Sequence, residues 1–302
     1  MKPDSILIVG SGALATLFAY RLAAAGIGVT MLCTWPQGLA ALRQGGAQVE
    51  GLGSSPVQAT DDPASCRGAK FALVLVKSWQ TERAAHQLAE CLADDGLAVT
   101  LQNGLGNDAL LARSLGLRRV SRGVTTVGAT LLSPGLVRPG GEGMVTLEAH
   151  RQLSALEGML RVASFNIDVV ADTQPAVWGK LVVNAAINPL TALLRIKNGT
   201  LLEFPTARKL MGELAEEAAA VARAVAVQLP FTDPARAAEE VARRTSGNTS
   251  SMLQDVMRGA PTEIEAINGA LVALGERNGV PLPINRVILS LVKALPINSG
   301  KI

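Results

Sequence analysis

Three polar residues interrupt an otherwise apolar stretch, WGKLVVNAAINPL, at positions 178–190. Lys180, Asn184 and Asn188 are spaced four apart, so on a helix they share one narrow stripe. A lysine on an apolar helix loses hydration, which lowers its pKa toward the range useful for proton transfer, and its charge stabilises a developing alkoxide. We therefore expect Lys180 to donate a proton and the asparagines to hold substrate oxygens. The alternative is structural: the lysine reaches water and the asparagines bond to neighbouring helices.

A second group of polar residues follows in NTSSMLQDV, positions 248–256, where small hydroxyl and amide side chains gather. Further along, Thr262 and Glu265 fit the S/T-x-x-E capping box at a helix start. That pattern assigns Glu265 a structural role and leaves Glu263 without one. We expect the Glu263 carboxylate to pair with a substrate hydroxyl, the cofactor or Lys180. The alternative is a solvated first-turn acid that the helix dipole favours.

The segment GSGALA follows an apolar run and begins an amphipathic one, which is the context of a dinucleotide-binding fingerprint. Gly10 permits the tight turn, Gly12 lets a pyrophosphate approach the main chain, and Ala15 lets the helix pack closely on the strand. The N–H groups at the helix start attract the anion. The alternative is a simple tight turn. The residues expected to bind the cofactor here are Gly10, Ser11, Gly12, Ala13, Leu14 and Ala15.

The residues after the next apolar run, VTML, normally decide which dinucleotide fits. An acid there binds the ribose 2′-OH, whereas an arginine accommodates a 2′-phosphate. This sequence has Cys33, Thr34 and Trp35, and no arginine is closer than Arg43. Thr34 can donate a hydrogen bond to either form, so NADPH is compatible with the sequence and NADH is not excluded.

Two further loops are placed for ligand contact. VLVKSWQ and LQNGLGN each follow a buried-looking strand, and ligands of open α/β sheets bind outside the carboxyl ends of the strands. Lys77 and Asn103 are therefore expected to contact cofactor or substrate, unless they only order their loops. His86 lies in a polar helical segment and His150 follows a strand, so neither is favoured as the acid that protonates an alkoxide.

Short apolar runs alternate with alanine-rich amphipathic segments in the first half of the chain, which is typical of βαβ units around a parallel sheet. Threonines, valines and turn signals between 123 and 147 favour antiparallel strands or a hairpin that closes the sheet. The expected strands cover 6–10, 29–32, 71–77 and 97–104, and the expected helices between them cover 13–26 and 81–93.

Strands become scarce after about residue 170, and segments punctuated by proline predict helices. The sequence thus predicts an α/β protein with a Rossmann-like dinucleotide-binding domain at 1–170 and an all-helical substrate domain at 171–302. The cleft between the two halves is the natural place for a site. The expected helices cover 175–195, 205–228, 233–258, 263–279 and 284–295.

Composition disfavours several classes of protein. With 302 residues, 48% of them apolar, the chain can bury a substantial core. The net charge is only +3, and no dense basic block interleaved with aromatics indicates a nucleic-acid partner. No apolar run reaches about 18 residues, so no membrane span is expected. Without an export signal, and with three scattered cysteines and two histidines, we expect a cytoplasmic protein that lacks disulfides and metal sites.

Six motifs occur in order along the chain: GSGALA, VKSWQ, LQNGLGN, WGKLVVNAAINPLTALL, NTSSMLQD and TEIEAINGAL. Together, from about residue 5 to about residue 290, they resemble the ketopantoate reductases, or 2-dehydropantoate 2-reductases. The resemblance implies a Rossmann domain followed by a helical domain. It also implies NADPH-dependent reduction of 2-dehydropantoate to (R)-pantoate on the route to pantothenate and coenzyme A.

The resemblance also assigns roles. It implies that Lys180 is the proton donor, and that Glu263 holds the substrate hydroxyl or the cofactor ribose and helps to order Lys180. Thr34 departs from the family, whose members commonly place an arginine there for the 2′-phosphate. Residues implied to bind substrate are Asn103, Lys180, Asn184, Asn188, Asn198, Asn248 and Ser251, the last of which would reach the carboxylate. Residues implied to line the cofactor site are Gly10 to Ala15, Thr34, Lys77, Asn103, Ala129 and Glu263.

Two rival interpretations stay open. One is a paralogous reductase of another 2-oxo acid, because the polar anchors do not define the shape of the pocket. The other is a dinucleotide-sensing regulator without catalysis, which is disfavoured because a sensor does not need the polar groups of the second domain. The partner is expected to be a small 2-oxo acid. The sequence leaves the assembly open, with a homodimer as one option.

Overall fold

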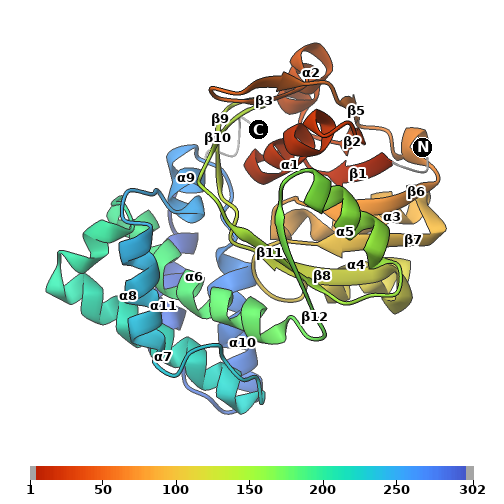
Figure 1. The fold of residues 1–302 in the computed structure, drawn as a ribbon. Coiled ribbons are helices and arrows are strands. Elements are labelled where there is room, and N and C mark those ends of the chain that lie inside the picture. The colour runs from red at the N-terminus through yellow and green to blue at the C-terminus, as the bar shows by residue number, and fades with distance from the viewer. Residues whose placement is uncertain (1–4, 297–302) are drawn as a thin grey trace. The chain divides into compact units, whose positions relative to one another are not determined.

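The computed structural model describes residues 5–296 and divides into two compact units (Figure 1). The first unit ends at Thr173, close to the expected boundary, and the second contains the chain that follows. Residues 103–105 are an exception, because they lie between two segments of the first unit in the sequence but belong to the second. Residues 1–4 and 297–302, which the expected domains included, lie outside the described part of the chain.

A mostly parallel sheet forms the centre of the first unit. Its strand order, within the described residues, is β12-β11-β8-β7-β6-β1-β2-β5, and neighbours are parallel except β8 and β11. This parallel core confirms the predicted α/β class. The strands are β1 (Ser5–Val9), β2 (Gly28–Leu32), β5 (Gln58–Thr60), β6 (Ala69–Val74), β7 (Leu92–Thr100), β8 (Val120–Thr125), β11 (Met144–Glu148) and β12 (Asn166–Val170).

Both faces of this sheet are covered by helices, which explains why its central strands are apolar throughout. Every residue of β1 is buried, and alternate side chains enter different cores. Ile6 and Ile8 join the core with α1 (Ala13–Ala24) and α5 (Leu153–Val162). Leu7 and Val9 join the opposite core with α3 (Thr81–Cys91) and α4 (Asn107–Leu115). The first βαβ unit therefore forms where the alternation of apolar runs predicts it.

A second, smaller sheet has the order β4-β3-β10-β9. The strands between 123 and 147 are antiparallel as predicted, since β8 pairs with β11 and β9 with β10. The hairpin of β9 and β10 does not close the main sheet, however, because β10 pairs with β3 instead. The bounds are β3 (Ala47–Val49), β4 (Gly53–Ser55), β9 (Ala129–Ser133) and β10 (Leu136–Pro139), and α2 (Pro36–Gly45) precedes β3.

The second unit is helical. Its central helix is α6 (Gln174–Leu194), which packs against α7, α8, α9 and α11 in one apolar core. Main-chain turns of 3-10 or π type connect these helices. The remaining elements are η4 (Gly199–Leu202), α7 (Pro205–Ala224), α8 (Pro234–Arg244), α9 (Ser251–Met257), the π-turn η5 (Glu265–Gly269), α10 (Ala270–Arg277) and α11 (Pro283–Lys293).

Two helical predictions need correction. The helix expected over 233–258 is interrupted, because α8 ends at Arg244 and α9 begins at Ser251. The Ser250 hydroxyl caps the second helix by accepting from Leu253 N at 3.1 Å, a local bond that competes with a continuous helix. The helix expected over 263–279 begins instead with the π-turn η5.

Helix α6 is long and apolar enough to cross a membrane by length and composition alone. An 18-residue window of it has a mean hydropathy of 1.3, yet 72% of that window is buried inside the protein. The second unit therefore uses this helix as the core around which its other helices pack.

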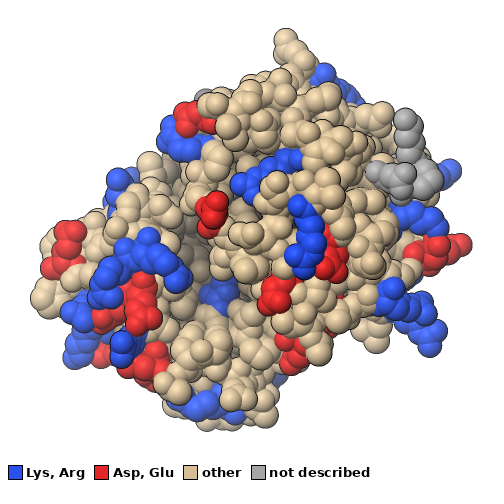
Figure 2. All heavy atoms as spheres, viewed as in Figure 1, with Lys and Arg blue, Asp and Glu red and all other residues tan. Residues whose placement is uncertain are grey.

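Basic and acidic side chains are interspersed over the face drawn in Figure 2. Ion pairs within the second unit include Arg208 of α7 with Glu239 of α8 at 2.6 Å and Arg236 with Glu240 at 3.0 Å. Exposed pairs of this kind contribute little stability.

Candidate active site

The glycine turn between β1 and α1 has two glycines with different tasks. Gly10 has a φ of +125°, and a Cβ there would lie 3.1 Å from the Leu75 carbonyl oxygen, so the turn excludes a side chain. Gly12 is the N-cap of α1, and a Cβ there would meet no atom within 4 Å. No side chain caps this helix start and its first turn carries no acid. The turn therefore fits an anionic diphosphate close to the N–H groups of Ala13, Leu14 and Ala15.

The segment after β2 places Thr34 at the surface. The neighbouring Cys33 is buried, and its thiol donates to the hydroxyl of Ser11 at 2.8 Å, which ties the end of β2 to the glycine turn. Arg43 is committed elsewhere, because it donates to Ala59 O at 3.0 Å and pairs with Asp61 at 3.1 Å. Position 34 therefore provides no guanidinium for a 2′-phosphate, and the guanidinium of Arg43 is already bonded to Ala59 and Asp61.

The loops after β6 and β7 are joined by a polar network. The Gln102 side-chain amide donates to Val76 O at 3.0 Å and to the Thr81 hydroxyl at 2.8 Å. Lys77, which lies between Val76 and Thr81 in the sequence, is half-buried. Ala129, the last expected cofactor contact of the first unit, begins β9. The hydrogen bonds of Gln102 thus order the loop that carries Lys77. The contacts of Lys77 and Ala129 with a cofactor stay predictions.

In the second unit, Lys180 lies on α6 with its amine withdrawn from water. Burial lowers the pKa of Lys180 to about 8, and the negative charge of Glu263 opposes that decrease. Glu263 is itself 6% exposed. The amine is therefore poised near neutral pH by the opposing effects of desolvation and one carboxylate, as the apolar setting of the lysine predicts.

Segment 103–105 forms hydrogen bonds with Glu263 and with the turn that follows it. The Asn103 side-chain amide donates to Glu263 Oε2 at 3.1 Å, and Leu105 N donates to Ala266 O at 3.1 Å. Gly104, with a φ of +84°, permits this approach, because a Cβ there would lie 2.5 Å from the Ala266 oxygen. Asn103, Glu263 and Lys180 thus form one connected polar group within the second unit.

The polar stripe of α6 continues through Asn184 and Asn188, the latter 6% exposed. Among the described residues, neither side-chain amide bonds to another protein group. The structural alternative, in which both asparagines bond to neighbouring helices, has no support in these contacts. Their contact with substrate stays a prediction.

The loop between α8 and α9 presents Asn248 and Ser251 at the surface. Asn198 is buried behind this loop at 7% exposure. Its main-chain N–H donates to Asn248 O at 3.1 Å, and its side-chain amide donates to the Thr245 hydroxyl at 2.9 Å. The structure therefore gives Asn198 a role in ordering the loop, in addition to the substrate contact expected of it.

Thr191 is a neighbour of this loop that the sequence did not single out. Its hydroxyl donates to Asn188 O at 2.9 Å and lies 2.7 Å from the hydroxyl of Ser250, the N-cap of α9. It thereby links the polar stripe to the loop that precedes Ser251. The sequence signal was weak, since Thr191 differs from its apolar neighbours only by a hydroxyl.

The capping box expected of Thr262 and Glu265 is not formed. The Thr262 hydroxyl accepts from Ile264 N at 3.4 Å, and the exposed Glu265 carboxylate pairs with Lys293 of α11 instead. The reason is that the segment starts with a bend and a π-turn rather than a regular α-helix.

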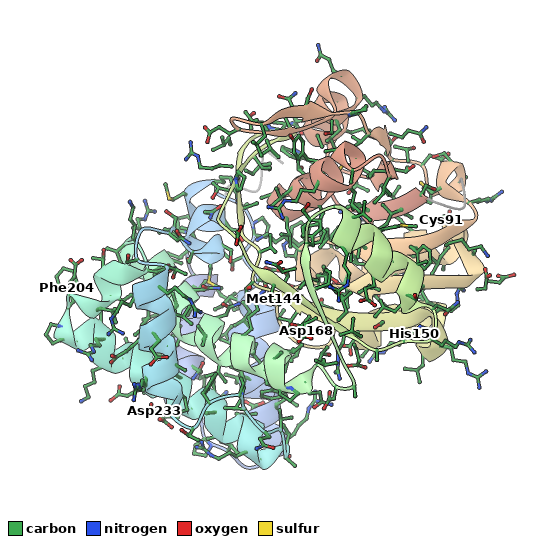
Figure 3. All side chains as sticks on the ribbon, viewed as in Figure 1. Cys91, Met144, His150, Asp168, Phe204 and Asp233 are labelled. Carbon is green, nitrogen blue, oxygen red and sulfur yellow. The ribbon has the colours of Figure 1, made fainter. Side chains whose placement is uncertain are left out.

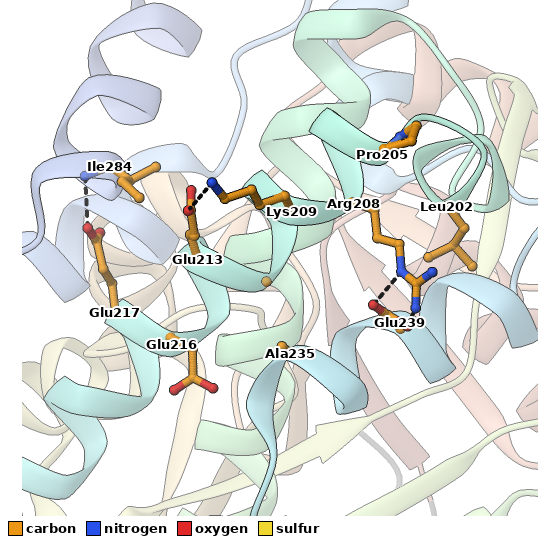
Figure 4. A pocket seen from close by; sticks show the side chains of 11 residues that line it. Leu202, Pro205, Arg208, Lys209, Glu213, Glu216, Glu217, Ala235, Glu239 and Ile284 are labelled. Atoms are coloured by element: carbon orange, nitrogen blue, oxygen red, sulfur yellow. Dashed lines mark hydrogen bonds and ion pairs between the residues drawn. The ribbon is translucent and has the colours of Figure 1, made fainter.

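The two histidines belong to the first unit. His86 is exposed, and a ring nitrogen of His150, labelled in Figure 3, lies 3.2 Å from Arg118 O in the first unit. No group of three or more metal-ligating side chains occurs among the described residues. A groove of about 760 Å³ on α7, α8 and α11 contains the pairs Arg208–Glu239 and Lys209–Glu213 (Figure 4). Neither Lys180 nor Glu263 lines it.

Comparisons with known proteins identify the family of this chain. Residues 6–152 match the family described as ketopantoate reductase PanE/ApbA, and residues 172–296 match its C-terminal domain. A 2-dehydropantoate 2-reductase from Archaeoglobus fulgidus is 37% identical over 303 residues, which cover 98% of this chain and 99% of the relative.

Solved structures show the same fold. A PanE/ApbA family ketopantoate reductase from Ralstonia eutropha JMP134 superposes with a TM-score of 0.89 at 33% identity, covering 96% of this chain and 98% of that one. A D-mandelate dehydrogenase with NADH and anilino(oxo)acetate has a TM-score of 0.88 at 24% identity, with 96% and 97% covered, and shares the fold. Fold and family matches define an NAD(P)H-dependent oxidoreductase with a nicotinamide dinucleotide cofactor. The chain belongs to the ketopantoate reductase family.

Replacing Gly12 by valine should weaken dinucleotide binding without unfolding the protein. The new side chain meets open space in the protein itself, so any loss arises from the ligand that it displaces. We expect the Kd for NADPH to rise about tenfold or more, an energetic effect of about 1.4 kcal/mol per decade, with an unchanged melting temperature. Calorimetric titration measures the first quantity and thermal denaturation the second. Gly158→Val, at an equally open position of α5, is the control, and equal affinities of the two variants would contradict the assignment.

The pKa of Lys180 predicts how turnover depends on pH. If the charged amine is the donor, kcat should be high at low pH and fall about tenfold per unit once the pH exceeds about 8. Glu263→Gln removes the charge that raises this pKa, so the descending limb should move to lower pH. Glu265→Gln, which changes an exposed acid nearby, is the matched control and should leave the limb in place. A limb that is identical in all three proteins would argue against Lys180 as the titrating group.

Proposed function

We propose that this protein reduces 2-dehydropantoate to (R)-pantoate with NADPH, a step toward pantothenate and coenzyme A. The observation that carries the proposal is the Lys180 amine, whose pKa is lowered to about 8 by burial, beside the buried Glu263. A general acid works best when its pKa lies near the operating pH. The names and the 30–37% identity of relatives such as those from Archaeoglobus fulgidus and Pyrococcus horikoshii support the choice of substrate.

Lys180 has two tasks in this proposal. Its charge stabilises the oxygen that becomes an alkoxide, and its proton moves from Nζ to that oxygen. Glu263 keeps the amine protonated at neutral pH, because its charge offsets part of the effect of burial on the pKa. Asn103 orients Glu263 through the bond from its amide. A bound nicotinamide dinucleotide supplies the hydride that reduces the keto carbon.

Substrate binding is proposed for the polar groups that surround the amine. Asn184 and Asn188 would hold oxygens of the keto acid, since their amides are not committed to protein partners among the described residues. Ser251 would donate to the substrate carboxylate, and Asn248 would contact it from the same loop. Asn198 is proposed to contribute through the loop that it orders.

The cofactor is proposed to sit on the glycine turn, with Lys77 and Ala129 as further contacts. Gly12 and the uncapped start of α1 fit its diphosphate. NADPH follows from the family resemblance. NADH is the second candidate, because an exposed threonine stands at position 34 and Arg43 is paired with Asp61.

A paralogous reductase of another 2-oxo acid is the alternative. A D-mandelate dehydrogenase shares the fold, so the fold does not select the acid. The rates of NADPH and NADH oxidation with 2-dehydropantoate, pyruvate and 2-oxoisovalerate distinguish these functions. We expect 2-dehydropantoate to have the highest kcat/KM, and equal values for the three acids would rule out the specific assignment. In the same assay, Lys180→Ala should lower kcat by about two to four orders of magnitude and leave the Kd for NADPH almost unchanged.

Position 34 provides a test of cofactor choice. Thr34→Arg should raise the ratio of kcat/KM for NADPH over that for NADH, because a guanidinium forms a charge-assisted contact with the 2′-phosphate. Thr34→Gln, which adds length without charge, serves as the control. An unchanged ratio in the arginine variant would mean that position 34 does not face the 2′ site.

A further inference from the structure

Pro189 lies inside α6 and withholds a hydrogen bond from it. In an α-helix each N–H donates to the carbonyl four residues earlier, and proline has no N–H, so the Ala185 carbonyl loses its helical partner. Ala185 is completely buried and Pro189 is buried beside it, so water does not replace that partner. A buried carbonyl without a donor destabilises the fold, which means that a donor has to come from elsewhere.

Asn268 is that donor. Its side-chain Nδ2 lies 3.0 Å from Ala185 O, and the whole residue is buried. Asn268 belongs to the π-turn η5, which is far from α6 in the sequence. Turns of this type contain an extra residue and are frequent at functional sites. The hydrogen bond that α6 lacks at Ala185 is thus formed by a side chain of the π-turn η5.

The orientation of the Asn268 amide follows from its partners. Asn285 Nδ2 donates to Glu217 Oε2 at 2.8 Å and to Leu214 O at 3.3 Å, and both of these oxygens can only accept. Asn285 Oδ1 therefore faces Asn268, whose Nδ2 donates to it at 2.9 Å. The Ala185 carbonyl also only accepts. The opposite orientation of Asn268 would set its oxygen against two acceptors.

The far end of this network is anchored in two helices. Glu217 of α7 accepts from Ile284 N at 2.9 Å (Figure 4). It also accepts from Asn285 N at 2.9 Å and so caps the start of α11. The carboxylate thereby fixes Asn285, and Asn285 fixes Asn268. The donor is held in place before it reaches α6.

The π-turn that carries Asn268 also shapes the surroundings of Glu263. The Glu263 carbonyl accepts from Ala266 N and Ile267 N, each at 3.1 Å. The Ala266 carbonyl in turn accepts from Leu105 N at 3.1 Å. A shift of this turn against α6 would therefore move Glu263 relative to the helix that carries Lys180.

We propose that Asn268 is a positioning residue for the reductase reaction: its amide completes the helix that Pro189 interrupts and thereby sets Glu263 against Lys180. This role rests on the proposed function. Asn268 itself touches neither substrate nor cofactor in the proposal. Its effect on the reaction passes through the carboxylate and the amine.

The test uses Asn268→Leu, Pro189→Ala and the double variant. Asn268→Leu has a similar size but no donor, so we expect a lower denaturation midpoint. We also expect kcat to fall about ten- to a hundredfold, in the range for small misplacements of catalytic groups, with the Kd for NADPH unchanged. Pro189→Ala restores an N–H four residues after Ala185. The double variant should therefore recover part of the denaturation midpoint, since Asn285 Oδ1 still lacks its donor. It should keep the low kcat, because the hydrogen bond from the π-turn to α6 is still absent.

The pKa of Lys180 gives a readout that needs no substrate. The pH dependence of its acylation by acetic anhydride, followed by peptide mass spectrometry, should show a lower pKa in Asn268→Leu, since Glu263 then acts on the amine less effectively. Asn278→Leu is the matched control: its amide also donates to a helix carbonyl, that of Leu274 at 2.8 Å, but at an exposed site. It should leave the midpoint, kcat and the pKa unchanged.

Each outcome decides a separate claim. If Pro189→Ala recovers none of the midpoint that Asn268→Leu loses, the replacement of a missing helical bond is wrong. If kcat and the Lys180 pKa recover together with the midpoint, or never change, Asn268 is only structural and the positioning role is wrong. If the unaltered protein does not reduce 2-dehydropantoate, the proposed function fails, while the midpoint and acylation measurements still test the role of Asn268.

Discussion

The desolvation of one ammonium group is the constraint on which the second unit depends. An amine on an apolar helix is unfavourable unless a negative charge lies nearby, and Glu263 provides that charge for Lys180. The carboxylate in turn needs donors in its own buried surroundings, one of which is Asn103. The buried Lys180 amine thus requires the Glu263 carboxylate, and the buried carboxylate requires a donor such as Asn103.

The parts of the fold that were predicted depend on local patterns. The side chains of residues 5–9 and 29–32 are buried on both faces of their strands, and a run of apolar residues indicates such strands directly. The break between α8 and α9 was missed, because no proline marks the loop and two of its hydrogen bonds come from Asn198 of a distant segment. The pairing of β10 with β3 likewise depends on contacts between distant residues.

The same distinction holds for the candidate site. Lys180 was found because its spacing from Asn184 and Asn188 is visible in one short segment, and the lowered pKa agrees with the apolar setting of that segment. That Asn103 belongs with the helical unit could not be predicted, because the link to Glu263 spans two parts of the chain. Asn268 was also missed. A proline at position 189 indicates that the Ala185 carbonyl lacks a main-chain donor, but the sequence does not indicate which side chain provides one.

The bond between Asn268 and Ala185 has a consequence for how this chain can change over generations. A lineage that replaces Pro189 first regains a main-chain donor, so a later loss of the Asn268 amide no longer leaves the Ala185 carbonyl unsatisfied, although the position of Glu263 still depends on that amide. A lineage that loses the amide of Asn268 first must pass through an intermediate with an unsatisfied buried carbonyl. The order of the two substitutions is therefore restricted, and the two positions should be inherited as a pair.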